Sequence, residues 1–405
     1  MLKRISVQDL RLGMYIHELC GSWMEHPFWR SRFLLTQQND LKTLLASGIR
    51  EVWIDTARGA DVAQGATART DEDVAEETEY LLREADKSLS TSTISMADEV
   101  RQAMKLCNTA KQSVVDMFST ARMGKAIEVG QALALVEDIA NSASRHPHAL
   151  ISLARLKNVD EYTYMHSVAV CGLMIALARQ LNMSEEHVRE AGLAGLLHDI
   201  GKIAITNQIL NKPGKLTDTE FAVMKTHPER GLRILQNSDS VSPAVLDVCL
   251  HHHEKIDGTG YPHGLRGDDI SLLARMGAVS DVYDAITSDR PYKQGWLPAE
   301  AIRKMAEWSK GHFDDAVFQA FVKTVGIYPI GSLVRLTSGR LGVVIEQNAD
   351  SLLTPRVKVF FSTKSRVQIA PEVVDLARQQ DEKIVGRESA ETWGFRNLEH
   401  LWIDQ

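Results

Sequence analysis

Leu196-Leu197-His198-Asp199-Ile200-Gly201-Lys202 is the stretch that decides the fold of this 405-residue chain. A histidine followed directly by an aspartate places two side chains with metal-ligating atoms at the end of an apolar, helix-like run. A His-Asp pair alone is weak, because such dipeptides occur by chance. Here the pair lies at the centre of a longer series of histidines and aspartates.

The other members of the series are His166, His227, His252, His253 and Asp281. They fall at intervals of about 25–32 positions, so each can lie on a helix of its own. Helices of a bundle can direct such side chains toward one interior point. Taken singly, each residue is better explained as a helix end, a cap or an exposed polar side chain. Taken together, the spacing favours a metal site.

The chemistry of these side chains is that of a two-metal hydrolase. Asp199 is the natural carboxylate to bridge two ions. Two ions about 3.5–4 Å apart can activate a water between them and stabilise the leaving oxygen of a phosphoester. A donor set of nitrogen and oxygen atoms suits Fe, Mn or Zn, whereas the many imidazoles argue against Ca²⁺.

Composition excludes several other classes of protein. The formal net charge of −7 argues against general nucleic-acid binding. The four cysteines form no C-x-x-C pair, so a zinc ribbon or a redox dithiol is not indicated. The N-terminus lacks the apolar segment of a secretory signal, and the longest apolar stretch, residues 168–178, is too short to cross a bilayer. We therefore expect a cytoplasmic protein without a membrane span.

The pattern of helix-like, strand-like and polar segments along the chain predicts a multidomain α+β protein with an all-α catalytic bundle. The expected regions are a small α/β N-terminal domain (1–56), a polar and acidic linker (57–95), a helical connector (96–146), a catalytic helical domain (147–330) and a small β-rich C-terminal segment and tail (331–405). The connector helices fit two arrangements equally well, because their apolar faces can pack on the bundle or on another copy of the chain.

Local signals place the individual elements. In the N-terminal domain we expect strands at 14–17, 32–35 and 51–55 and a helix at 41–46. Ser184 and Ser242 are expected to open two helices, and a capping box from Thr217 to Glu220 a third that ends near His227. After Pro329 the pattern turns to short strands, which indicate a small sheet or partial barrel.

Further residues beside the candidate ligands are expected to contact a substrate. The glycine-rich run 258–264 builds a tight loop at the mouth of the metal site. Arginine can grip a phosphate as a fork and lysine as a point charge. The alternative for each is a plain turn or a surface salt bridge. The candidate substrate-binding residues are Tyr261, Pro262, Arg290, Lys293 and Lys202.

Residues 162–328 closely resemble the HD-GYP family of bacterial phosphodiesterases. The matching runs are Tyr164-Met-His166-Ser, His198-Asp199-Ile-Gly-Lys202, Leu210-Asn-Lys-Pro-Gly-Lys215-Leu-Thr, Met224-Lys-Thr-His227-Pro, His251-His-His-Glu-Lys-Ile-Asp257-Gly-Thr-Gly260-Tyr-Pro262 and Asp281-Val-Tyr-Asp284-Ala-Ile-Thr-Ser-Asp-Arg290-Pro-Tyr-Lys293. About the first 130 residues also look like the N-terminal domain commonly fused to such modules in proteobacteria. The C-terminal segment offers no comparable match.

The resemblance implies hydrolysis of cyclic di-GMP to linear pGpG, and onward to GMP, by a bridging hydroxide in a binuclear Fe or Mn centre. Members with three metals carry a Glu four positions before the first histidine, where this chain has Tyr162, with Glu161 one step off. The resemblance therefore implies two metals, and because members with two metals stop mainly at pGpG, it leaves complete conversion to GMP open. The ligands would be His166, His198, Asp199 and Asp281 for one metal, and Asp199, His227, His252 and His253 for the other.

The same resemblance implies roles for the remaining residues. Lys202 would act in catalysis with Asp199 by steadying the phosphate, and Asp284 would orient a neighbouring group. Arg290 and Lys293 would hold the far phosphate. Two further hypotheses compete with this one: a non-catalytic receptor for cyclic di-GMP or adaptor for diguanylate cyclase domains, and a phosphodiesterase for cyclic GMP-AMP or another cyclic nucleotide. A homodimer is compatible with each.

Overall fold

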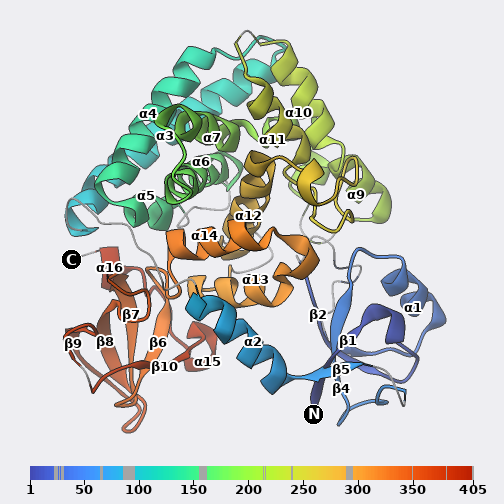
Figure 1. Ribbon diagram of the computed structural model, residues 1–405, viewed down its shortest axis with the longest axis vertical. Coiled ribbons are helices and arrows are strands. Elements are labelled where there is room, and N and C mark those ends of the chain that lie inside the picture. The colour runs from blue at the N-terminus through green and yellow to red at the C-terminus, as the bar shows by residue number, and fades with distance from the viewer. Residues whose placement is uncertain are drawn as a thin grey trace.

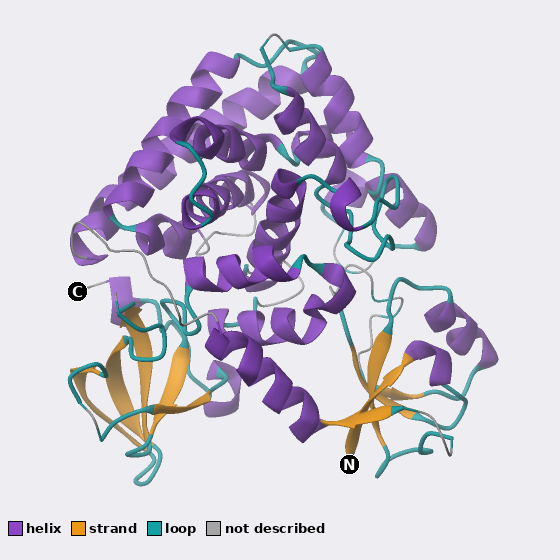
Figure 2. Cartoon of the chain, in the orientation of Figure 1, coloured by secondary structure: helices purple, strands orange, loops and turns teal. Residues whose placement is uncertain are grey.

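The computed structural model describes residues 1–21, 26, 28, 32–63, 67–84, 96–154, 162–212, 214, 216–238, 240–288, 295–348, 350–379 and 381–403. Figure 1 shows a bundle of helices with two small sheets beneath it, one formed by N-terminal and the other by C-terminal residues. In Figure 2 the strands are confined to these two units, and the described residues between them are drawn as helix or loop. The expected α+β fold with a central all-helical region is confirmed.

The N-terminal unit is an antiparallel sheet with strand order β3-β2-β4-β1-β5. Its elements are β1 (Leu2–Ser6), β2 (Tyr15–Leu19), β3 (Phe33–Leu34), α1 (Gln38–Leu45), β4 (Glu51–Asp55) and β5 (Ala68–Thr70). In β4, Val52 and Ile54 belong to the core of this unit, whereas Trp53 joins the main core of the protein. Because strand side chains alternate between faces, the sheet is covered on both sides.

The expected linker is wrong for residues 68–84, which form β5 and the helix α2 (Asp71–Glu84). Val74, Thr78 and Leu82 are spaced by four and buried, so they form one helical face. The acidic residues 71–73 lie in the first turn, where they favour a helix because of its dipole. Helix α2 packs on α13 (Pro298–His312), and together they separate the two sheets.

The connector helices α3 (Met96–Arg122) and α4 (Val129–Arg145) belong to the bundle. Helix α3 packs on α4, α5 (Pro147–Ala154) and α6 (Tyr162–Gln180), and α4 packs on α7 (Glu185–Leu197). One continuous hydrophobic core runs through these helices and on into the C-terminal sheet. The apolar faces that could have paired with a second copy therefore pack within the chain, apart from Met104 and Leu133, which are exposed.

A buried carboxylate anchors α3 to α4. Glu99 is 0% exposed and accepts hydrogen bonds from Ser142 Oγ (2.6 Å) and from Arg145 Nε (2.7 Å) and Nη2 (2.8 Å). A buried charge is stable only when such partners satisfy it. Arg145 in turn is held at the last turn of α4, where a cation suits the helix dipole.

We expect Glu99→Gln to lower the free energy of unfolding by about 1.5–3 kcal/mol, because hydrogen bonds to a charged group contribute about that much. Urea denaturation followed by circular dichroism measures it. Glu137→Gln is the matched control, since the half-exposed Glu137 pairs with Arg189 at 2.9 Å on the surface of the bundle. Equal losses in the two variants would contradict the anchoring role.

The remaining bundle helices begin where caps place them. Ser184 accepts from His187 N at the start of α7, and Ser242 does the same for Val245 N in α11 (Pro243–His251). The capping box at Thr217 and Glu220 opens α9 (Asp218–Met224). The expected end of this helix near His227 is wrong, because α9 ends earlier and His227 begins α10 (His227–Gln236). The bundle also contains α8 (Asn207–Leu210), α12 (Leu272–Thr287) and α14 (Asp315–Val325).

The C-terminal residues form an antiparallel sheet with strand order β10-β6-β7-β8-β9. Its elements are β6 (Leu333–Leu336), β7 (Arg340–Glu346), β8 (Arg356–Ser362), β9 (Val367–Asp375), β10 (Ile384–Arg387), α15 (Ala390–Trp393) and α16 (His400–Ile403). Trp402 on α16 is buried, and this helix packs on β7. Within the described ranges, no helix combines the length and the apolar character needed to span a bilayer.

Candidate metal centre

Five helices of the bundle bring the histidine and aspartate series together. His166 lies on α6, His198 caps the C-terminus of α7, His227 begins α10, and His252 follows the end of α11. Asp281 lies on α12. His253 is half-buried, and the other six members of the series, Asp199 included, are buried. Side chains up to 115 positions apart in the chain thus meet in one interior cluster, as the spacing predicts.

Asp199 lies at the middle of the cluster, and its two oxygens face different histidines. Oδ2 is 3.4 Å from Nε2 of both His166 and His198. Oδ1 is 3.2 Å from His227 Nε2 and 3.8 Å from His252 Nε2. The carboxylate therefore joins two groups of potential ligands, one with His166 and His198 and one with His227, His252 and His253. This is the position that a bridging carboxylate requires.

Asp281 closes the cluster from the opposite side. Its Oδ1 lies 3.0 Å from His166 Nε2 and 3.8 Å from His198 Nε2, and its Oδ2 lies 3.7 Å from His253 Nδ1. Of these three histidines, His166 is the nearest to Asp281. Because Asp281 also faces His253, it borders both groups.

Hydrogen bonds behind the histidines orient their rings. The Nδ1 atom of His166 lies 2.6 Å from Asp284 Oδ2, and that of His198 lies 2.8 Å from Gly195 O. His227 Nδ1 lies 2.8 Å from Met224 O, and His252 Nδ1 lies 3.0 Å from Cys249 O. Each acceptor draws the proton to Nδ1, so that the lone pair of Nε2 points to the centre. Metal-ligating histidines are typically held in this way.

Three buried atoms at the centre make no hydrogen bond within the described part of the chain: His198 Nε2, Asp199 Oδ1 and Asp281 Oδ2. Buried polar atoms are otherwise almost always paired, because leaving one unpaired costs about 1–3 kcal/mol. All three are electron-pair donors that point to the same place. Divalent cations would satisfy them, so the residues present fit a metal centre.

The electrostatics of the cluster are consistent with cation binding. Burial acts to lower the pKa of His198, but the Asp199 and Asp281 carboxylates outweigh it and raise this pKa to about 10. In His252 burial prevails, and with the neighbouring His198 and His227 it lowers the pKa to about 3. Burial opposes ionisation of Asp199, yet Lys202 and His198 hold its pKa well below the ordinary value. The ionised carboxylates suit cation binding directly, whereas His198 would release a proton when a metal binds, because imidazole ligates a metal in its neutral form.

The backbone at Gly201, just after the His198-Asp199 pair, packs closely against the backbone of α10. A Cβ atom on Gly201 would lie only 2.9 Å from the Cα of Gly231, a distance that real Cβ contacts essentially never show. The residue two positions after Asp199 must therefore be glycine for His227 to stay close to that carboxylate.

The predicted substrate-contacting residues Lys202, Tyr261 and Pro262 border the cluster. Lys202 follows Asp199 by three positions and donates to its Oδ2, with its side chain 20% exposed. The ring of Tyr261 stacks on that of His253 with centroids 4.7 Å apart, and Pro262 is half-buried beside it. The predicted residues Arg290 and Lys293 lie outside the described residues, as do Glu161 and the side chain of Tyr162.

One residue of the site, Glu254, is not among those predicted from the sequence. The Glu254 carboxylate is buried and accepts backbone hydrogen bonds from His263 (2.7 Å), Gly264 (3.1 Å) and Leu265 (3.1 Å). It thereby folds the glycine-rich loop that carries Tyr261 back onto the end of α11. An acidic residue directly after three histidines and before a glycine-rich run is the signal that could have identified it.

Two family models match the chain. A model described as a domain of unknown function, DUF3391, matches residues 2–132, and a model described as an HD domain matches residues 134–317. The first match includes α3, although this helix packs within the bundle. The second match contains every residue of the metal-ligand series.

Relatives match over the whole chain or over its helical part. A Pseudomonas aeruginosa protein named cyclic di-GMP phosphodiesterase is 60% identical over 404 residues, 99% of this chain and 96% of that protein. A Xanthomonas campestris protein named cyclic di-GMP phosphodiesterase response regulator is 44% identical over 42% of this chain and 47% of its own length. A Vibrio cholerae protein named 3'3'-cGAMP-specific phosphodiesterase 3 is 37% identical over 42% of this chain and 36% of its own length.

Proposed function

This chain belongs to the HD-GYP family of metal-dependent phosphodiesterases, and we propose that it hydrolyses cyclic di-GMP to linear pGpG and onward to GMP. The observation that carries the proposal is the position of Asp199, whose two oxygens face two separate groups of histidines. Such an arrangement suits two adjacent cations on one phosphodiester. The proposed place of action is the cytoplasm, where we expect a bacterial second messenger to be degraded.

The proposed centre holds two divalent ions, Fe or Mn. One is assigned to His166, His198, Asp199 and Asp281, and the other to Asp199, His227, His252 and His253. The donor atoms are imidazole nitrogens and carboxylate oxygens, which suit these metals. When bound, such ions polarise the phosphoryl oxygens and lower the pKa of an attacking water.

The protein residues orient the reacting groups. Asp284 accepts from His166 Nδ1 and so fixes the ring that faces Asp199 and Asp281. Lys202 brings an ammonium group to the edge of the cluster, where it can stabilise negative charge that develops on the phosphate. Tyr261 and Pro262 are assigned to the substrate because they border His253, and Arg290 and Lys293 are assigned to the distal phosphate.

The direct test is to incubate the full chain, loaded anaerobically with Fe or with Mn, with cyclic di-GMP and to separate the products by ion-exchange chromatography. We expect pGpG to appear first and GMP later. An absence of linear product, with both metals confirmed by elemental analysis, would refute the proposal. The outcome in which pGpG accumulates without GMP would restrict the activity to the first bond.

Cyclic GMP-AMP is the second candidate substrate, because a relative named for that activity shares the helical region at 37% identity. The relative that spans nearly the whole chain is named for cyclic di-GMP, which favours the first candidate. A competition experiment with both dinucleotides at equal concentration distinguishes the two candidate substrates. The ratio of their hydrolysis rates in one reaction gives the ratio of their kcat/KM values. A ratio that favours cyclic GMP-AMP would reverse the assignment.

Removal of the metal should abolish turnover and destabilise the helical bundle. The chelated protein leaves carboxylate and imidazole atoms buried without partners, so we expect its melting temperature to lie below that of the loaded protein. Mn²⁺ or Fe²⁺ should restore both activity and melting temperature, whereas Ca²⁺ should restore neither. Undiminished turnover in a chain shown to be metal-free would contradict this prediction.

A further inference from the structure

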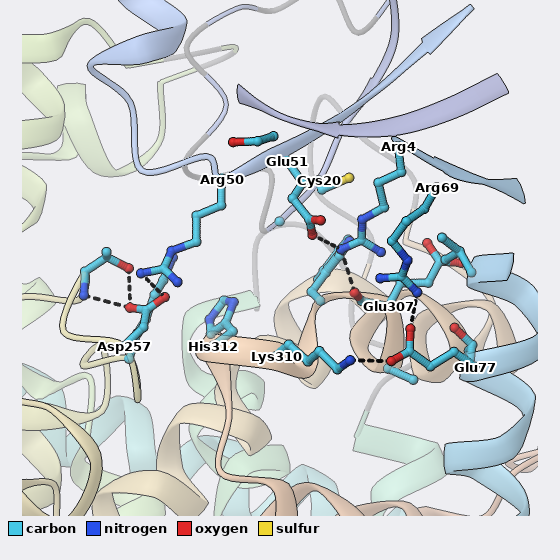
Figure 3. A pocket seen from close by; sticks show the side chains of 18 of the residues that line it. Arg4, Cys20, Arg50, Glu51, Arg69, Glu77, Asp257, Glu307, Lys310 and His312 are labelled. Atoms are coloured by element: carbon cyan, nitrogen blue, oxygen red, sulfur yellow. Dashed lines mark hydrogen bonds and ion pairs between the residues drawn. The ribbon is translucent and has the colours of Figure 1, made fainter. Parts of the chain in front are cut away.

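A cavity lies where the N-terminal sheet meets the helical bundle, and none of the seven members of the metal-ligand series lines it. Its volume is about 400 Å³, which is in the range of small-molecule sites. Figure 3 shows side chains entering it from three directions: Arg4, Arg50 and Glu51 from the N-terminal unit, Glu77 from α2, and Glu307 and Lys310 from α13. Val74, Leu81 and Trp308 add an apolar portion to the wall.

Five cations and four acids lie among the described lining residues. The cations are Arg4, Arg50, Arg69, Lys255 and Lys310, and the acids are Glu51, Glu77, Asp257 and Glu307. Glu51 pairs with Arg4 and Asp257 with Arg50, while Glu77 is shared by Arg69 and Lys310. The Glu307 carboxylate is paired with Arg303 and Lys304, which do not line the cavity. Burial, together with the nearby charges of Lys255 and Arg50, holds the pKa of His312 well below its ordinary value. This ring therefore adds no positive charge to the cavity.

Two of the lining residues each carry a buried N–H donor that makes no hydrogen bond within the described residues. They are Nε of Arg4, which is 5% exposed, and Nε1 of Trp308, which is 6% exposed. The other end of the Arg4 guanidinium is held by Glu51 and by Glu307 O (2.8 Å), so its position is fixed. Orphaned donors beside an excess of cations call for a ligand with negatively charged acceptor oxygens.

We propose that this cavity binds a small molecule with an anionic oxygen group, either a phosphate or a carboxylate, next to an apolar portion. Such a ligand would satisfy the donors of Arg4 and Trp308, and its apolar part would lie against Val74 and Leu81. The site also borders the glycine-rich run 258–264, because Thr259 lines it. Asp257 pairs with Arg50 at 2.6 Å and accepts from Thr259 N at 2.8 Å, two positions before Tyr261.

Binding can be measured on the full metal-loaded chain by calorimetry with three matched probes: phenyl phosphate, benzoate and the uncharged benzamide. We expect at least one of the two anions to bind, and benzamide to bind at least tenfold more weakly. Arg69→Gln removes one cation of the wall and should weaken anion binding at least tenfold. Arg101→Gln on the exposed face of α3 is the matched control and should bind like the wild type.

Asp199→Asn distinguishes anion binding in this cavity from anion binding at the metal centre. It should disable the metal centre and leave anion binding in the cavity unchanged. If Arg69→Gln melts below the wild type, Trp308→Phe provides a second test, since it removes the orphaned N–H and keeps an aromatic ring. The proposal is overturned if neither anion binds better than benzamide, or if binding survives Arg69→Gln and Trp308→Phe. Loss of binding in Asp199→Asn would likewise overturn it by placing the anion at the metal centre. The phosphate and benzoate arms decide between the two anionic groups.

Discussion

Asp199→Asn should reduce turnover of cyclic di-GMP by more than about 100-fold, because residues that merely support a metal ligand already contribute about 10- to 100-fold. The substitution keeps the size of the side chain and removes the negative charge of the carboxylate, which faces four imidazoles. Both proposed metals share this carboxylate. We therefore expect the bound metal per chain to fall together with the rate.

The measurements are product formation by chromatography and metal content by elemental analysis on the same sample. Asp116→Asn is the matched control, since Asp116 lies on the exposed face of α3 and accepts a hydrogen bond from Gln112 on the same helix. Wild-type metal content with a rate within tenfold of wild type would show that Asp199 does not bridge the centre. Retained folding in both variants is checked by their melting temperatures.

Lys202→Met should lower kcat by about 100- to 1,000-fold, the typical effect of removing one donor that stabilises charge in a transition state. Methionine keeps most of the aliphatic chain and removes the ammonium group next to Asp199. Because Lys202 is not itself a proposed ligand, metal content should stay near the wild-type value. Steady-state kinetics with saturating Mn²⁺ separate this effect from a change in KM.

Lys105→Met on the exposed face of α3 is the control for Lys202→Met and should leave kcat unchanged. An unchanged kcat in Lys202→Met would remove this residue from the catalytic step. A loss of bound metal that parallels the loss of rate would give Lys202 a different role, in which it maintains the ionised state of Asp199 instead of contacting the phosphate.

Much of the helical region could be predicted because its signals are local. Ser184, Ser242 and the Thr217–Glu220 box each cap the next few backbone N–H groups, so they mark helix starts without reference to the rest of the chain. The linker prediction failed because α2 depends on distant contacts. Its polar composition resembles a linker, and its partners, α13, α14 and β1, are supplied by tertiary packing and by pairing of β5 with β1.

The sequence by itself determined which side chains form the histidine and aspartate cluster and which family the chain resembles, because residue types and their helical spacing are local properties of the chain. The tertiary structure alone decided that the two oxygens of Asp199 face different histidines, that Glu254 folds the loop bearing Tyr261, and that Arg4 meets α13 across a charged cavity. Distances between residues far apart in the chain follow from how helices and sheets pack, and no local pattern encodes them.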